Sequence, residues 1–373
     1  MKTWQKLRKD PTLWDRYFIR EKVLTAIRRF FLDRGFHDVE TPFLTGSLPP
    51  ESYLDIFETT LLDRHRRKTR AFLPTSPEPF LKKLLVAGIG NCFSITKSFR
   101  NTEGQSKTHN PEFTILEWYR VDADYTDIMR DCEELLLFIN TYLLRSKEPT
   151  EATQSSTRLR YRGHTVDLSP PWERITVRDA FRRYAGINLS EALTRAKMAT
   201  AAQKKGYRVR ADDLWEEIFH QIFLNELEPK LGRGRPTIIY DYPVVLAALS
   251  RKKKTDPRFA ERFEFYIEGL ELGDAYSELT DWKEQLARFR SEQEERDRLG
   301  KTEHPIDDDF ITALKAGMPK AGGIAVGVDR LIMLFSDTNN IADTLFFPAD
   351  DLFEVTTETG EKTRKKKKRA GGK

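Results

Sequence analysis

Two neighbouring polar segments contain residues suited to bind a nucleotide. The first reads Phe99-Arg100-Asn101-Thr102-Glu103, and the second reads His109-Asn110-Pro111-Glu112-Phe113. Because the flanking residues read as strands, we expect Arg100 at the mouth of a hairpin, where its guanidinium can pair bidentately with a phosphate. Phe113 on the returning strand offers a ring on which a base can stack. Taken alone, Arg100 could equally be an ordinary surface cation, so the argument depends on the whole string.

Two glutamates, Glu271 and Glu278, stand seven residues apart in Gly269-Leu270-Glu271-Leu272-Gly273-Asp274-Ala275-Tyr276-Ser277-Glu278-Leu279. Carboxylates are hard oxygen ligands that suit Mg²⁺ bound together with substrate phosphates. We therefore expect the pair to form a magnesium site on or near one strand end. The alternative is that each glutamate forms an ion pair with a nearby Arg or Lys.

A glycine-rich strand and a helix start supply further candidates. Glycine lets a ligand approach the backbone closely, and in Gly327-Val328-Asp329-Arg330 the arginine stands at a helix start, where it can face polyphosphate. Packing explains these glycines equally well. In Thr75-Ser76-Pro77-Glu78, Ser76 is the expected N-cap of a helix. Glu78 fits the helix dipole, and as a functional residue it would hold the ammonium group of a basic substrate.

The elements that must position these residues do not follow a regular βαβ order. Apolar spacings of three and four predict helices over residues 15–34 and 126–144, and further helices are expected over 176–184, 212–227 and 282–299. Strands are predicted over 93–99, 112–119, 237–242 and 262–269, and another over 322–330 that enters an apolar helix. Residues 146–170 lose periodicity and read as a surface linker. The pattern favours an α+β domain, a mostly antiparallel sheet flanked by helices.

Composition and charge exclude several classes of protein. The chain has 373 residues and a formal net charge of +5, but residues 361–373 carry +7, which leaves −2 for residues 1–360. The folded part is therefore not a basic nucleic-acid-binding body. The basic tail is either solvated or an electrostatic arm for RNA or an acidic partner. Two cysteines argue against a disulfide framework. With no apolar run of about 18 residues and no signal region, we expect a cytoplasmic protein that does not enter a membrane.

Three strings in this order resemble the signature motifs of class II aminoacyl-tRNA synthetases. The segment from Gly35 to Pro42 is similar to motif 1, which forms dimers; Phe99 to Phe113 is similar to motif 2; and Gly327 to Arg330 is similar to motif 3. His109-Asn110-Pro111-Glu112-Phe113-Thr114 and Tyr276-Ser277-Glu278-Leu279 resemble strings of the lysine enzymes. The resemblance covers residues 12–348.

The resemblance also points to a truncated branch of this family. Lysyl-tRNA synthetases carry an N-terminal OB-fold domain that binds the anticodon, and here the helix leading to motif 1 begins near residue 15, so we expect no such domain. The elongation factor P lysine ligases share this layout. Ser76, where the synthetases usually have Ala, and Ala325, where they usually have Gly, also favour that branch. An extra methyl group beside the amino-acid pocket is worth about 1–3 kcal/mol of discrimination, so Ala325 is a candidate selector between α- and β-lysine.

The resemblance implies a role for each candidate residue. ATP would be bound by Arg100, Asn101, Asn110, Phe113, Glu271, Leu272, Gly327 and Arg330; Mg²⁺ by Glu271 and Glu278; and the amino acid by Ser76, Glu78, Tyr119, Glu278 and Ala325. Arg100, Arg330 and Glu278 would carry catalysis. In motif 2, Glu103 either replaces the glutamate usual one position earlier or that contact is lost.

The expected function is activation of lysine or β-lysine as the adenylate and its transfer to a lysine side chain of elongation factor P, by a homodimer. Two alternatives stay open at this point: a minimal synthetase that charges tRNA, and a non-catalytic binding or regulatory protein of the same fold. The expected organisation is a catalytic domain over residues 1–348 with a helical insertion at 150–232, followed by a disordered basic tail at 349–373.

Overall fold

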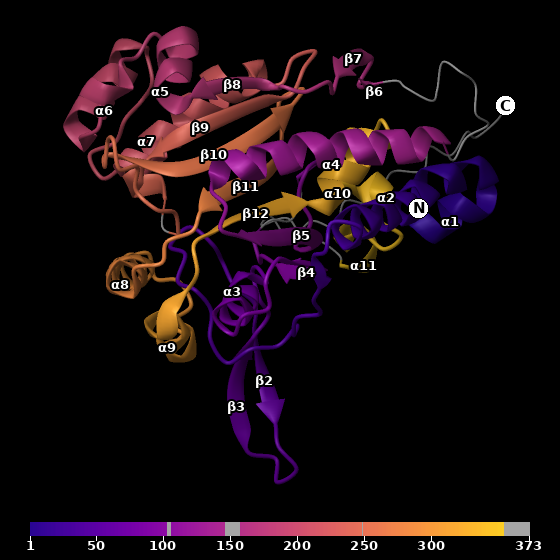
Figure 1. Ribbon diagram of the computed structural model, residues 1–373, viewed down its shortest axis with the longest axis horizontal. Helices are drawn as coiled ribbons and strands as arrows, with labels where there is room; N and C mark the ends of the chain where they lie inside the picture. The colour runs from indigo at the N-terminus through magenta and orange to yellow at the C-terminus, as the bar shows by residue number, and fades with distance from the viewer. Residues whose placement is uncertain (103–105, 146–156, 248, 354–373) are drawn as a thin grey trace, which may run out of the picture.

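The centre of the fold is one eight-stranded sheet, seen in a computed structural model that describes residues 1–102, 106–145, 157–247 and 249–353 (Figure 1). Its strand order is β1-β4-β5-β12-β11-β10-β9-β8, and only the outer pairs β1–β4 and β8–β9 are parallel. The strands span β1 His37–Asp38, β4 Cys92–Phe99, β5 Glu112–Val121, β8 Glu173–Thr176, β9 Thr237–Pro243, β10 Phe259–Ile267, β11 Leu270–Ser277 and β12 Ala321–Gly327. The predicted α+β class with a mostly antiparallel sheet is confirmed.

Helices α2 and α4 cover one face of this sheet, and α3 packs against β4 and β5 on the other face. The long helices α2 and α4 pack on each other, and α4 also lies against β10, β11 and β12 (Figure 1). The helices span α1 Thr3–Lys9, α2 Trp14–Leu32, α3 Glu78–Val86, α4 Tyr125–Arg145, α5 Val177–Ala180, α6 Arg195–Lys204, α7 Trp215–Ile222, α8 Trp282–Arg298, α9 Asp308–Gly317, α10 Val328–Phe335 and α11 Ala349–Leu352. No helix in the described ranges is both long and apolar enough to cross a membrane.

Side chains alternate between the two faces of the central strands, as the pleat requires. On β5, Leu116 and Trp118 join the apolar core under α2 and α4, whereas the alternate residues Glu117 and Tyr119 are absent from that core. On β10, Phe263 and Phe265 join the same core, and Glu264 lies between them. The sheet therefore has one apolar face and one face that buries carboxylates, and the polar face is where chemistry can take place.

Most of the predicted elements are present with shifted ends. The helix predicted over residues 15–34 is α2, with Val23, Ile27, Phe30 and Phe31 buried, but Phe18, predicted on its apolar face, is 46% exposed. The helix predicted to be capped by Ser76 begins at Glu78; the Ser76 hydroxyl still accepts the Glu78 N–H at 3.0 Å.

The interpretation of residues 146–170 as a linker was wrong for the described part, and the predicted helical insertion at 150–232 contains strands beside its helices α5, α6 and α7. Strands β6 Arg158–Tyr161 and β7 His164–Asp167 form a hairpin, and β8 is an edge strand of the main sheet. These strands are only four residues long, too short for a period-two pattern to be recognised. A separate apolar core forms where α5, α6 and α7 pack near β9 and β10. The boundaries of the domain and of its insertion remain predictions.

Two further segments departed from expectation. A hairpin of β2 Glu58–Leu62 and β3 Lys68–Phe72 was not predicted, because its residues are almost all exposed and show no apolar face. The predicted disordered tail starts with the short helix α11, and the basic run at 362–369 lies outside the described residues.

The aromatic cluster between α2 and the sheet yields a prediction about stability. Phe31 is fully buried, and its ring contacts those of Phe36, Phe93 and Trp118 at centroid distances of 5.1, 4.9 and 5.0 Å. Phe31→Ala is expected to lower the free energy of unfolding by about 3–5 kcal/mol, because it leaves a cavity in the core. The matched control is Leu224→Ala at a side chain that is 55% exposed. Urea unfolding of both variants measures the difference, and equal losses would contradict this view of the core.

Candidate active site

A buried lysine joins two carboxylates at the centre of the polar face. Helix α3 supplies Glu78 and Lys82 one turn apart, and the residue after β11 supplies Glu278. The Lys82 ammonium lies 2.5 Å from Glu278 Oε2 and also pairs with Glu78 Oε1. The side chains of Lys82 and Glu278 are each 1% exposed. Although burial alone would lower it, the charges of Glu278 and Glu78 raise the pKa of Lys82, so this ammonium stays protonated.

A third carboxylate, Glu117, completes this pocket. It comes from the polar face of β5 and is 1% exposed. The Ser76 hydroxyl donates to Glu117 Oε1 at 2.6 Å, and the Tyr119 hydroxyl donates to Oε2 at 3.2 Å. The candidates Ser76, Glu78, Tyr119 and Glu278 are thus brought together. No role was predicted for Glu117 from the sequence, although a glutamate between two apolar residues of a predicted strand could have indicated a buried carboxylate.

The carboxylates of this pocket outnumber its cation. Burial, with the charge of Glu78 added, raises the pKa of Glu117 to about 8. Burial likewise raises the pKa of Glu278 to about 7, although the Lys82 charge opposes the shift. Glu78, Glu117 and Glu278 surround one ammonium, so a second cation entering the pocket would gain favourable electrostatic interactions in a site that excludes water. The pocket is therefore suited to a substrate with an ammonium group.

Strand β12 lets these side chains approach its backbone closely. A Cβ atom at Gly323 would lie 2.4 Å from both Glu278 Oε1 and Tyr119 Cε1, so only glycine allows their approach. Two residues along, Ala325 pairs with Glu117 on β5 and with Asp274 on β11. Directly opposed residues on neighbouring strands have Cβ atoms about 5 Å apart. The methyl group of Ala325 consequently borders the site next to Glu117.

A second cluster gathers arginines at the other end of β11. Arg330 Nη1 donates to the backbone oxygen of Glu271 at 2.9 Å and lies 3.2 Å from its Oε2, and Arg330 Nη2 lies 2.9 Å from His109 Nε2. Burial would raise the pKa of Glu271, but the positive charges of Arg330, Arg262 and Arg100 lower it. The Arg100 guanidinium lies 5.2 Å from the centre of the Phe113 ring. This cluster thus combines cations that can bind phosphates with an aromatic ring that can stack on a base, the two groups that a nucleoside triphosphate requires.

Other residues predicted to bind ATP serve the fold in this structure. Asn110 donates to the Glu112 carbonyl at 2.6 Å and accepts from the Ala349 N–H at 3.0 Å. The Asn101 side-chain amide lies 3.4 Å from the Ile56 carbonyl. Leu272 is 1% exposed and packs in the apolar core, so only its backbone can face a ligand. Gly327 precedes α10 beside the Arg330 side chain, and Glu103 lies outside the described residues.

The prediction that Glu271 and Glu278 hold one magnesium ion was wrong in its geometry. Seven residues of extended strand span about 23 Å, so the two carboxylates lie at opposite ends of β11. Glu271 faces Arg330, whereas Glu278 faces Lys82. Spacing in the sequence did not reveal this, because β11 runs straight through the site instead of turning back. No group of three or more metal-ligand side chains occurs among the described residues.

Glu264 on the neighbouring strand β10 is the carboxylate placed to share a metal ion with Glu271. Burial raises the pKa of Glu264 to about 7; Arg262 opposes this shift and the negative charge of Glu271 adds to it. Arg262 Nη2 lies 2.7 Å from Glu264 Oε1, and Arg262 also binds both oxygens of Asp274 at 2.9 and 3.0 Å. Two coupled carboxylates beside arginines suit Mg²⁺ that takes its other ligands from phosphate oxygens.

Asp329 in the third motif has a structural role. It is 2% exposed, pairs with Arg20 of α2 and accepts the Thr114 N–H of β5 at 2.7 Å. This ties the start of α10, and with it Arg330, to the sheet.

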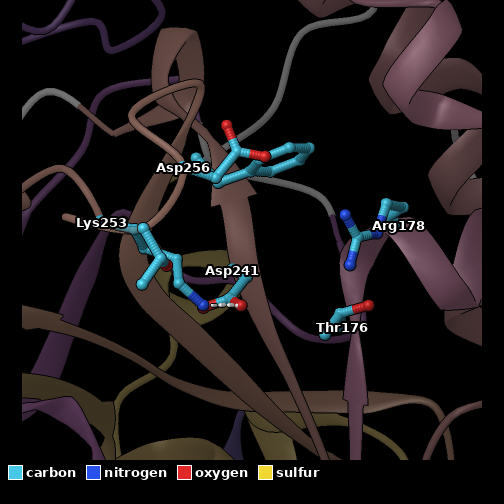
Figure 2. Close-up of a pocket in the computed structure, with 7 residues that line it drawn as sticks. Thr176, Arg178, Asp241, Lys253 and Asp256 are labelled. Atoms are coloured by element: carbon cyan, nitrogen blue, oxygen red, sulfur yellow. Dashed lines mark hydrogen bonds and ion pairs between the residues drawn. The ribbon is translucent and has the colours of Figure 1, made fainter.

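The structure also contains a cavity of about 110 Å³ that none of the candidate residues lines. Figure 2 shows Thr176 and Arg178 on one side of it and the ion-paired Lys253 and Asp241 on the other. It lies at the β8–β9 end of the sheet, away from Glu278 and Arg330. The chemistry described above therefore does not extend to this cavity.

Comparison with known proteins assigns this chain to a family. Residues 2–351 match the family of tRNA synthetases class II (D, K and N). Similar proteins are named lysine--tRNA ligase: that of Pelotomaculum thermopropionicum is 35% identical over 344 residues, 91% of this chain and 64% of that protein. Those of Clostridium perfringens (34%, 65% of that protein) and Carboxydothermus hydrogenoformans (35%, 66% of that protein) also match 91% of this chain. The chain spans a little under two thirds of the length of these relatives.

The Lys82 ion pairs lead to a prediction about stability and pH. Lys82→Met is expected to lower the free energy of unfolding by about 3–5 kcal/mol, because it leaves buried carboxylates without a counter-ion. Neutral Glu278 avoids this penalty, and its pKa is raised in the folded state. The loss should therefore be largest at high pH and shrink as the pH falls from 9 towards 6.

The control is the adjacent Lys83→Met, whose ammonium pairs with Asp307 and Asp309 nearer the surface and is 24% exposed. Its loss should stay below about 1 kcal/mol. Denaturant unfolding of both variants at several pH values is the measurement. A Lys82→Met loss that does not vary with pH would show that the pocket carboxylates do not carry the penalty.

Proposed function

This chain belongs to the tRNA synthetases of class II (D, K and N), and we propose that it uses ATP and Mg²⁺ to convert lysine or β-lysine into an aminoacyl-adenylate. The observation that carries the proposal is the buried pocket of Glu78, Glu117 and Glu278 around a single ammonium, that of Lys82. Such an excess of carboxylate selects a cationic amino acid. The names of similar proteins, which are lysine--tRNA ligases, support the same substrate class.

The second cluster is where the triphosphate would bind. Arg100 and Arg330 would neutralise phosphate oxygens, and Phe113 would stack on the adenine. Glu264 and Glu271 would hold Mg²⁺, which supplies charge neutralisation between phosphate oxygens. A substrate carboxylate oxygen then attacks the α-phosphorus, the bond from that phosphorus to the bridging oxygen breaks, and pyrophosphate leaves. The chain contributes position and fixed charge to this step and forms no covalent bond.

The two clusters would bind the two substrates of one reaction, the amino acid and ATP. The amino acid's side-chain ammonium would lie among Glu78, Glu117 and Glu278, with Ser76, Tyr119 and Ala325 around it. Both clusters lie along β11, with Glu278 just past one end and Glu271 near the other. An amino acid anchored by its ammonium at one end would therefore present its carboxylate towards the arginines.

For the second step, we propose that a lysine side chain of elongation factor P is the acceptor. Its amine would attack the carbonyl carbon of the adenylate, AMP would leave, and an amide would form. The resemblance of Ser76 and Ala325 to the protein-modifying branch supports this acceptor. The alternative acceptor is a tRNA hydroxyl, which the names of the similar proteins favour. We also propose a homodimer in the cytoplasm; exposed Phe18, Leu32 and Phe43, at 46, 52 and 49%, support a contact through α2 and the segment after β1.

The raised pKa of Glu117 predicts how binding depends on pH. The ammonium needs an ionised carboxylate, and Glu117 is protonated below its pKa of about 8. The Kd for lysine is therefore expected to fall about tenfold per pH unit as the pH rises towards 8, and then to level off. In Glu117→Gln, binding should be weaker, and the levelling point should move to about 7, where Glu278 titrates. Calorimetric titration with lysine between pH 5.5 and 9.5 measures this, and a flat profile for the unmodified protein would refute it.

The activation step is tested by pyrophosphate release with ATP, Mg²⁺ and either lysine or β-lysine. Glu278→Ala and Arg330→Ala are each expected to lower kcat/KM at least about a hundredfold, since each removes a fixed charge that would bind a substrate group of opposite charge. Glu294→Ala, at an exposed carboxylate on α8, is the control and should retain full activity. Full adenylate formation by Glu278→Ala would refute the assignment of the pocket.

The acceptor is tested by adding elongation factor P and tRNA together and analysing both by intact mass and acid gel electrophoresis. A mass increase on elongation factor P supports the proposed acceptor. Aminoacylation of tRNA alone would instead establish the alternative.

A further inference from the structure

The hairpin of β2 and β3 stands away from the body of the molecule as an arm (Figure 1). All five residues of β2 are exposed, as are Lys68, Thr69 and Arg70 of β3. From Arg66 at the turn to Phe72 at the base, the extended backbone spans about 20 Å. The arm adds almost nothing to the apolar core, so a contribution to the stability of the fold does not explain why the arm is there.

The base of the arm is anchored to the body of the molecule, four residues before Ser76. Phe72 is fully buried with Leu48 and Ile56, and its backbone exchanges hydrogen bonds of 3.0 and 2.8 Å with Thr45. Arg70 binds both oxygens of Glu58 across the hairpin at 2.7 and 3.0 Å, and its Nη2 donates to a carbonyl oxygen of the body at 2.8 Å. The chain reaches Ser76 four residues after Phe72. The arm is therefore held at a set position relative to the site.

The tip of the arm is cationic. Asp63 supports the turn, since it accepts the His65 and Arg67 N–H groups at 2.8 and 2.9 Å and the Arg67 Nε–H at 2.6 Å. Within the described ranges, the ammonium or guanidinium groups of Arg64, Arg66 and Lys68 form no ion pair. The tip thus presents three cations whose charge the fold leaves available.

Apolar side chains lie next to these cations. Leu61 and Leu62 at the end of β2 are 51 and 46% exposed. Residues 59–62 contain no charged side chain, and among the residues that the structure describes, β2 pairs only with β3, which leaves its other edge open. Open strand edges without charge are suited to pairing with another chain.

We propose that this arm docks the macromolecular acceptor of the reaction, and that the surface it binds is an acidic protein surface. The proposal rests on the function proposed above. Lysine and ATP are too small to need an arm of this length, whereas a macromolecule must be aligned before one of its amines can reach the adenylate. Exposed leucines beside arginines are typical of a protein interface. Residues 58–70 contain no Phe, Tyr or Trp on which nucleotide bases would stack, so RNA fits this surface less well.

The test replaces the cations of the tip and measures the two steps separately. The variant is Arg64→Glu, Arg66→Glu and Lys68→Glu combined. Its matched control is Lys197→Glu, Lys204→Glu and Arg208→Glu, an equal charge change at exposed residues in and just after α6, at the other end of the molecule (Figure 1). Pyrophosphate release with ATP and lysine reports activation, and intact mass of elongation factor P reports transfer.

Both variants should activate lysine at the rate of the unmodified protein. The tip variant is expected to lower kcat/KM for elongation factor P at least about tenfold, chiefly through KM, and the control should not change it. Equal transfer by the two variants would overturn the proposal, and so would a defect of the tip variant seen only with tRNA. If the unmodified protein does not label elongation factor P, the function proposed above fails instead, a result distinct from a failure of the arm.

Discussion

The ammonium of Lys82 is the interaction on which the arrangement of the site depends. It pairs with Glu78 within helix α3 and joins this helix to the end of β11, at the centre of the sheet, through Glu278. Without it, the carboxylates of the polar face would repel one another in a place where water cannot screen them. With it, one carboxylate charge is offset and the remainder is available to a ligand. The same ammonium that ties α3 to the sheet therefore leaves the pocket with more carboxylates than cations.

The pleated sheet makes this arrangement compatible with a stable fold. Because β5 and β10 alternate strictly, Trp118 and Phe263 bury apolar surface under α2 and α4, while Glu117 and Glu264 face the other way. The free energy lost by burying carboxylates on one face is offset by the apolar packing on the other. The arginine cluster follows the same logic, since Asp274 and Glu264 hold Arg262 close enough to Glu271 to lower the pKa of that carboxyl.

The sequence predicted those parts of the fold in which a periodic pattern spans many residues. Helices α2 and α4 and the hairpin of β4 and β5 have such patterns. The motif strings singled out Arg100, Arg330 and Glu278 as candidate site residues. It did not predict the four-residue strands or the exposed hairpin, where no apolar period exists. It also paired Glu271 with Glu278 because linear spacing does not say whether a strand turns. Glu117 was missed because its partners Ser76 and Glu78 are distant in the sequence. Glu264 was missed because linear spacing does not show that the β10–β11 hairpin brings it close to Glu271.

Strand β12 has a consequence for how substrate choice can change. The wall at Gly323 is backbone, already at the smallest size an amino acid allows, and the space in front of it is filled by Tyr119 and Glu278. Substitution there can only narrow the pocket. A laboratory selection for bulkier substrates would have to find its space at Ala325, Ser76 or Tyr119, where side-chain atoms remain to be removed. The pocket can therefore be enlarged only on the side of these three side chains. The backbone wall at Gly323 would stay the same in every such variant.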